Sequence, residues 1–226
     1  MNGFLAAAVN VVEAVSPSTT AGTADPNGAA ALIPDAIVER FHTLLDQARA
    51  AGEPEPTAMS LATANAQGRP SVRTVLLKHL DPYGFVFYTN TESDKGRQLQ
   101  ENPQAALCFL WKHLDLGVQV RAEGAVTPVD AAEADTYFAS RPRGSQIGAW
   151  ASQQSRPLDR RPSLEAAIDA LERQYAGGPV PRPPHWSGYR LCPDRVEFWF
   201  GRPFRLHDRI LHVRGADGWQ ESMLQP

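Results

Sequence analysis

The sequence predicts a mainly β fold with flanking helices, and three observations support this prediction. Runs rich in β-branched and aromatic residues, such as residues 85–89 and 118–126, recur between turn-forming residues. Helical patterns occur before and between these runs but do not alternate with them, which excludes a doubly wound α/β fold. No Gly-rich phosphate loop opens a helix, which excludes the usual dinucleotide-binding folds.

The composition is typical of a soluble globular protein, with 42% hydrophobic and 21% charged residues in a chain of 226. Residues 1–33 are rich in Ala, Ser, Thr and Gly, so we expect a flexible tail there and a single domain over residues 34–226. The net charge of −3 argues against a nucleic-acid partner. Neither a signal-peptide pattern nor a run of transmembrane length occurs, so we expect a cytoplasmic protein without a membrane partner, with Cys108 and Cys192 as free thiols.

Periodicity and turn residues predict the first folded elements. A helical pattern starts at Asp35 and ends before Gly52. Residues 58–63 and 71–79 follow as two strands joined by a turn, and residues 85–89 add a third strand of an antiparallel meander.

Arg73 and Lys78 enclose an apolar run within the second of these strands, on opposite faces of it. Half-buried cations need anionic partners, so the pattern suggests anionic groups beside the strand, and the equally open alternative is that both side chains reach solvent. A helix predicted to open at Ser93 carries Lys95 and Arg97 in its first turns. These two cations either face an anion together with the helix amides or lie on the solvated surface.

The middle of the chain contains a candidate phosphate site. Strands are predicted over residues 105–111 and 118–126, followed by a helix capped by Thr127. Tyr137 and Arg141 share one face of that helix, and Ser145 is expected to cap a second short helix. A phenol, a guanidinium and a hydroxyl suit a phosphate monoester, and the alternative is simple capping and surface placement.

The C-terminal part is predicted as a helix over residues 163–175 and then strands at 188–192, 195–200 and 209–213, with a short one around Trp219. If residues 205–209 are extended, Arg205, His207 and Arg209 lie on one face, where they repel one another unless an anion lies among them. His207 and His212 are five residues apart and cannot share a strand face, so no metal site is predicted.

Several motifs occur together in the chain: the runs Arg73 to Lys78 and Phe87 to Asn90, the run Ser140 to Trp150, Gln154-Ser155, Glu197-Phe198-Trp199 and Arg205-Leu206-His207-Asp208-Arg209. Together they resemble the pyridoxamine 5′-phosphate oxidase family. The resemblance implies an FMN-binding split β-barrel that works as a homodimer, with flavin sites built from both subunits. It also implies oxidation of pyridoxine or pyridoxamine 5′-phosphate to pyridoxal 5′-phosphate, with O₂ reoxidising the flavin to give peroxide.

The resemblance also implies roles for individual residues. FMN would be held by Arg73, Thr74, Val75, Leu76, Leu77, Lys78, Tyr88, Thr89, Lys95, Gln119, Gln154, Ser155, Trp199 and Arg209. The phosphorylated pyridine substrate would be bound by Lys78, Tyr137, Arg141 and Ser145, with the catalytic residues Arg205 and His207 over its ring.

The chain departs from the family pattern at a few positions. Asp94 stands where many members have Arg, Glu55 replaces a more usual Asp, Val118 precedes Gln119 where Arg is frequent, and the loop at 112–117 is longer. The tail lacks the Arg- and Tyr-bearing segment that closes over the substrate in some members. Two alternatives stay open: a related flavin oxidase acting on another aromatic substrate, such as the phenazine-pathway oxidases, and a module that carries FMN or pyridoxal phosphate without turnover.

Overall fold

The computed structural model describes residues 32–226, so the expectation of a flexible tail over residues 1–31 lies outside the described residues. Ile33, which the sequence analysis assigns to the tail, is 1% exposed, and its amide donates to the Pro82 carbonyl oxygen at 2.7 Å. The packed part of the chain therefore includes at least this residue before Pro34. No helix within residues 32–226 is long and apolar enough to cross a membrane.

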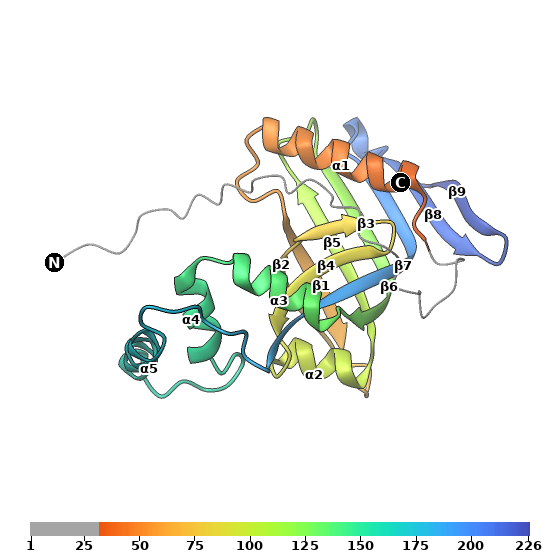
Figure 1. The fold of residues 1–226 in the computed structure, drawn as a ribbon. Helices are drawn as coiled ribbons and strands as arrows, with labels where there is room; N and C mark the ends of the chain where they lie inside the picture. The colour runs from red at the N-terminus through yellow and green to blue at the C-terminus, as the bar shows by residue number, and fades with distance from the viewer. Residues whose placement is uncertain (1–31) are drawn as a thin grey trace.

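The expectation of a mainly β fold with flanking helices is confirmed (Figure 1). The strands are β1 (Ala58–Ala64), β2 (Pro70–Leu76), β3 (His79–Asp81), β4 (Gly84–Asn90), β5 (Gln104–Trp111), β6 (Val118–Pro128), β7 (Trp186–Phe200), β8 (Asp208–Gly215) and β9 (Gly218–Leu224). The helices are α1 (Asp35–Ala50), α2 (Asp94–Glu101), α3 (Ala131–Ser140), α4 (Arg143–Ala151) and α5 (Arg161–Gln174).

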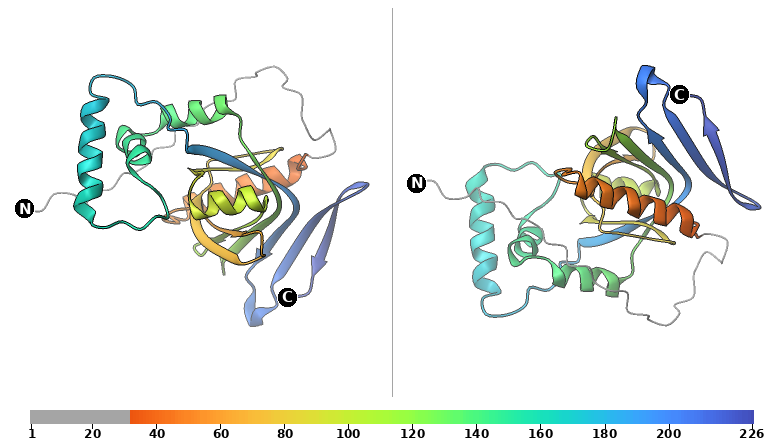
Figure 2. Two further views of the ribbon diagram at one scale, coloured as in Figure 1. Left: turned by 90° about the horizontal axis from the view of Figure 1, so that it is seen from below. Right: turned by 90° about the horizontal axis from the view of Figure 1, so that it is seen from above.

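Within residues 32–226 the nine strands form one sheet in the order β2-β1-β5-β6-β7-β4-β3, and β8 and β9 extend it from β7. The sheet curls around an apolar core, with α1 across one end and α2 across the other (Figure 2). Phe41 of α1 packs edge-on against Phe109 with ring centroids 5.0 Å apart. Side chains of the sheet that point into this core define its inner face, and those that point away define its outer face.

Helices α3, α4 and α5 lie to one side of the curled sheet (Figure 1). Val86 on the outer face of β4 packs with Val129 and with Ala134 of α3. Phe138 and Ile147, from α3 and α4, form a second apolar cluster with Trp186 at the start of β7. This cluster fixes α3 and α4 against the outer face of β4.

Three predictions about the strands are wrong, because a local pattern does not specify a strand's distant partners. β4 pairs with β7 and with the short β3 but not with β2, so the meander predicted over residues 58–89 is interrupted after β2. The run 71–79 splits where the chain changes partners: the amide of Leu77 donates to the Thr57 carbonyl, and that of Lys78 to the Val86 carbonyl. The runs 188–192 and 195–200 are one strand, β7, whose register shifts opposite Glu123/Gly124.

Three local predictions are also wrong. The first helix after β6 is capped by Asp130 rather than Thr127, because β6 stays paired with β7 as far as Pro128. Ser145 lies inside the first turn of α4 and is not its cap. The segment around Arg205 is not extended but turns, with φ values of 58° at Phe204 and 62° at Arg205.

Candidate active site

The first group of predicted site residues gathers at the start of α2. Arg73 lies on the inner face of β2, opposite Leu61 of β1. Its guanidinium donates to Thr63 Oγ1 at 2.5 Å and to Gln98 Oε1 at 3.3 Å. Gln98 belongs to α2, so these contacts tie the helix to the end of the barrel.

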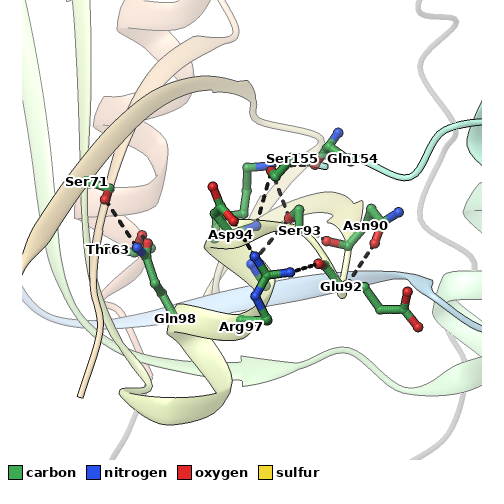
Figure 3. Close-up of polar contacts among 12 residues, drawn as sticks. Thr63, Ser71, Asn90, Glu92, Ser93, Asp94, Arg97, Gln98, Gln154 and Ser155 are labelled. Carbon is green, nitrogen blue, oxygen red and sulfur yellow. Dashed lines mark hydrogen bonds and ion pairs between the residues drawn. The ribbon is translucent and has the colours of Figure 1, made fainter. Parts of the chain in front are cut away.

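Lys95, in the first turn of α2, lies within electrostatic range of Arg73. Its Nζ donates to Gln154 Oε1 at 2.6 Å and to Thr89 Oγ1 and Ser93 Oγ, each at 3.3 Å. Gln154 belongs to the loop after α4, which Figure 3 shows against the start of α2. Ser93 caps the helix by accepting from the Gly96 amide.

These contacts bring five predicted FMN residues together: Arg73, Thr89, Lys95, Gln154 and Ser155, whose Oγ accepts from the Asp94 amide at 3.2 Å. Burial lowers the pKa of Arg73 and of Lys95, and the charge of Arg73 lowers that of Lys95 further. A half-buried guanidinium and a buried ammonium near a helix N-terminus form a suitable site for an anion such as a phosphate. The residues present therefore fit the phosphate of FMN.

A second group surrounds Arg141, directly after α3. Its guanidinium carbon lies 4.6 Å from the ring centroid of Trp186 and 5.5 Å from that of Phe138. One terminal nitrogen, Nη1, is buried and has no hydrogen-bond partner. Buried polar groups without a partner are rare, so this donor is available to a ligand or to an ordered water. Stacking thus holds this donor in place while leaving it free for an acceptor.

Lys78 and Tyr137 complete this second group. Burial lowers the pKa of Lys78, and the charge of Arg141 lowers it further against the opposing effect of Glu55. Lys78 and Arg141 therefore lie close enough to repel one another, which an anion between them would relieve. Tyr137 stacks on Tyr88 with ring centroids 4.0 Å apart. Arg141, Lys78 and Tyr137 together fit a small phosphorylated ligand.

Tyr88 and Thr89, both predicted to hold FMN, point to opposite faces of β4. Thr89 shares the inner face with Phe87 and contacts Lys95, whereas Tyr88 stacks against both Tyr137 and Trp186 on the outer face. The Tyr88 hydroxyl donates to Glu133 Oε1 at 3.3 Å, and burial and the Glu133 charge raise its pKa. In this chain Tyr88 therefore supports the second group rather than joining the first.

The third group of predicted residues lies elsewhere, on β6, β7 and β8. Gln119, Trp199 and Arg209 are direct neighbours across these strands on the outer face. The His207 ring lies 4.4 Å from that of Trp199. Arg205 follows the exposed residue Phe204 in the turn before β8. The inner-face residue Arg73 and this outer-face group lie on opposite sides of one sheet, so one chain does not bring them onto one flavin.

Arg209 is held by the buried carboxylate of Glu197, a residue that belongs to the Glu197-Phe198-Trp199 motif. Glu197 is 2% exposed and accepts from Arg209 Nε at 2.7 Å and from Arg121 Nη2 at 2.8 Å. Burial alone would raise the pKa of Glu197, but Arg209 and Arg121 outweigh it and hold the pKa below its ordinary value. The carboxylate fixes the position of Arg209 through two hydrogen bonds.

Sequence reasoning missed two further residues that shape the second group. Trp186 follows a proline-rich linker and carries no periodic signal. Glu133 is in the first turn of α3, where an acid is expected for helix stability alone. Neither position offered a signal that separates a role at the site from an ordinary structural one.

The remaining predicted site residues lie on β2, just after β2, or in α4. Val75 and Leu77 of the run 73–78 pack toward the core, and Thr74 is exposed on β2. Leu76 is the last residue of β2. Ser145 is exposed in the first turn of α4, four residues after Arg141 in the sequence.

Comparison with protein families matches most of the chain. Residues 44–175 match the model described as "Pyridoxamine 5′-phosphate oxidase", and residues 186–226 match the "Pyridoxine 5′-phosphate oxidase C-terminal dimerisation region". A pyridoxine/pyridoxamine 5′-phosphate oxidase of Myxococcus xanthus is 54% identical over 195 residues, covering 86% of this chain and 94% of that protein. A protein of the same name from Anaeromyxobacter dehalogenans is 54% identical over 193 residues, covering 85% of this chain and 96% of that one.

Two solved structures share the fold. PhzG from Burkholderia lata, solved in complex with tetrahydrophenazine-1-carboxylic acid, is 32% identical with a TM-score of 0.78, covering 90% of this chain and 98% of that one. An FMN-binding, pyridoxamine 5′-phosphate oxidase-related protein from Nostoc punctiforme has a TM-score of 0.65 at 18% identity, covering 82% and 97%. The expected split β-barrel is thus confirmed, and the chain belongs to the pyridoxamine 5′-phosphate oxidase family.

Proposed function

We propose that this protein is an FMN-dependent oxidase that converts pyridoxine or pyridoxamine 5′-phosphate into pyridoxal 5′-phosphate. The alcohol gives pyridoxal 5′-phosphate and hydrogen peroxide from one O₂, and the amine also consumes water and releases ammonia. The single observation that carries the substrate class is the buried, unpartnered Nη1 of Arg141, whose guanidinium stacks on Trp186 and lies within electrostatic range of Lys78. The names of the 54% identical relatives support the same substrates.

Bound FMN would supply the redox chemistry, a two-electron oxidation of the substrate at C4′ with O₂ as the final acceptor. Arg73 and Lys95, at the N-terminal end of α2, would hold the flavin phosphate, with Thr89, Gln154 and Ser155 around it. Lys78, Tyr137 and Arg141 bind the substrate phosphate and thereby fix how far the pyridine ring enters the site. Such positioning lowers the entropic cost of bringing the two rings together.

Gln119, Trp199, Arg209, Arg205 and His207 complete the site from a second copy of the chain in this proposal. The match of residues 186–226 to a dimerisation region supports a homodimer, because those residues carry four of the five. Arg205 and His207 then lie over the substrate ring, where a cation and an imidazole stabilise charge that develops during oxidation.

A second candidate is oxidation of a tricyclic aromatic acid, favoured by the 0.78 TM-score with PhzG. A substrate without a phosphate gives Arg141 Nη1 and Lys78 no doubly charged partner, so the geometry around these two residues favours the phosphorylated pyridine. A module that only carries FMN or pyridoxal phosphate has the same contacts but no turnover.

Oxygen consumption by the purified, FMN-loaded protein separates these candidates. We expect turnover with pyridoxine 5′-phosphate and pyridoxamine 5′-phosphate, and much less with unphosphorylated pyridoxine. Faster turnover of a dihydro- or tetrahydrophenazine carboxylic acid would favour the second candidate. Flavin released by heat should run with an FMN standard, and recovery of FAD, or of no flavin after reconstitution, would contradict the proposed cofactor.

A further inference from the structure

The proposed FMN phosphate site contains a carboxylate, that of Asp94. Burial lowers the pKa of Arg73 and of Lys95, whereas the charge of Asp94 raises both, so the carboxylate lies within electrostatic range of both cations. A phosphate monoester carries a charge of about −2 at neutral pH. Asp94 therefore cancels one of the two positive charges that Arg73 and Lys95 offer to such a group.

Arg97 restores the missing positive charge. Its Nη2 donates to Asp94 Oδ1 and its Nη1 to the Glu92 carbonyl oxygen (Figure 3). Asp94 and Arg97 are three residues apart in α2 and so share one face of the helix. The Asp94 amide donates in turn to Ser155 Oγ at 3.2 Å, so the same residue joins the ion pair to the predicted phosphate contacts.

Fold stability does not explain this ion pair. The Arg97 and Asp94 side chains are 35% and 59% exposed, and ion pairs at such exposure contribute little to stability. Two contacts nevertheless hold the Arg97 guanidinium, one of them to the backbone carbonyl just before the helix cap. An ordered cation at this place acts on the charge of the site rather than on the stability of α2.

We propose that Arg97 is a positioning residue for the flavin phosphate. It neutralises the charge of Asp94 and holds the Asp94 carboxylate in an ion pair. This inference rests on the proposed FMN site and adds a determinant of the preference for a phosphorylated flavin. Because the effect is electrostatic, it acts on FMN and not on riboflavin, which has the same ring system without the phosphate. It also weakens as salt screens the charges.

The test is to titrate the full-length apoprotein with FMN and with riboflavin and follow quenching of flavin fluorescence. Arg97→Gln should weaken FMN binding about three- to tenfold at low salt, as expected for one unpaired charge near a dianion, and should leave riboflavin affinity unchanged. Asp94→Asn should bind FMN at least as tightly as the wild type. The double variant should recover wild-type FMN affinity, because no unpaired carboxylate remains.

The matched control is Arg49→Gln, which removes an exposed Arg–Asp pair of the same spacing, with Asp46, from α1. It should change neither affinity. Equal weakening of FMN and riboflavin by Arg97→Gln, or no rescue by Asp94→Asn, would overturn the inference while leaving FMN as the cofactor. Failure of the wild-type protein to bind FMN would instead overturn the proposed cofactor, and the inference with it.

Discussion

Arg141 is the residue on which the proposed substrate depends most directly. Its Nη1 is already desolvated and without a partner, so a phosphate gains a charge-assisted hydrogen bond there without displacing another contact. We expect Arg141→Ala to weaken binding of pyridoxine 5′-phosphate by about 1.5–3 kcal/mol, the range for a hydrogen bond to a charged group, and to leave the FMN content unchanged. Steady-state kinetics and the visible spectrum measure both effects.

Arg205→Ala is the comparison for this variant. Arg205 is proposed to lie over the reacting ring, so its loss should lower kcat as well as raise KM. If Arg141→Ala lost its flavin but kept wild-type affinity for the substrate, the division into a flavin site and a substrate site would be wrong.

His212 makes the stability of the fold depend on pH. Burial lowers its pKa below the ordinary value and the charge of Arg40 lowers it further, against the opposing charge of Glu221. Below about pH 6.5 the His212 side chain binds a proton in the unfolded chain but not in the folded chain. The contribution of neutral His212 to stability is therefore present above this pH and is lost as the pH falls. The loss is bounded by about 1.4 kcal/mol per pH unit.

Melting temperatures at pH 7.5 and 5.5 measure this effect. The drop on acidification should be smaller for His212→Phe, which keeps a ring against Phe198, than for the wild type. His113→Asn, at an exposed position, is the control and should keep the wild-type drop. An identical drop in His212→Phe would exclude His212 as the source.

At the scale of elements, the sequence predicted which segments are strands and helices better than it predicted their partners. The predicted helix from Asp35 and the helix opened by Ser93 correspond to α1 and α2, because their apolar spacing and caps are local signals. The pairing of β4 with β7 joins residues about 100 positions apart, and no local pattern encodes it. The split between β2 and β3 was missed for the same reason.

Some residues of the candidate site could likewise be predicted from local patterns, and others could not. The anion site at α2 could be expected from Arg73 and Lys95 as cations beside apolar runs and a helix start. Its completion by Gln154 depends on where the loop after α4 folds back, and only the family resemblance indicated that residue. Trp186 and Glu197 act through burial and distant contacts that a sequence pattern does not show.

The start of α2 requires a glycine. A Cβ at position 96 would lie 2.2 Å from the Thr91 carbonyl oxygen, a backbone atom that cannot move without shifting the turn before the helix. We expect Gly96→Ala to displace Lys95 and the first amides of α2, and so to lower both the melting temperature and the FMN content.

Gly148→Ala in α4 is the matched control for this prediction. A Cβ there meets no heavy atom within 4 Å, so the substitution should be neutral or stabilise the protein by about 0.5–1 kcal/mol through helix propensity. Thermal melts and the ratio of flavin to protein absorbance measure both variants. Retention of full flavin content in Gly96→Ala would show that α2 tolerates the shift.

At the scale of the whole molecule, the arrangement of the predicted contacts is that of two half-sites. Arg73 and Thr89 lie on the inner face of the sheet with Lys95 at the barrel end, whereas Trp199 and Arg209 lie on the outer face. The proposed two-fold dimer would resolve this separation, because each copy could present its outer-face group to the α2 end of the other. Assembly and cofactor binding are then linked, and each should stabilise the other.

The proposed linkage between dimer assembly and FMN binding can be measured. Sedimentation of the FMN-loaded protein at micromolar concentration should give about twice the chain mass of 24.7 kDa. Leu110 lies on the outer face beside Gln119 and is 48% exposed, so Leu110→Arg places a charge where the second copy is expected and should lower both the dimer fraction and the flavin content. Leu158→Arg, at a similarly exposed apolar position in the loop before α5, should leave both unchanged. A flavin-loaded monomer would contradict the two-copy site, because it would show that one chain holds FMN without Trp199 and Arg209 of another.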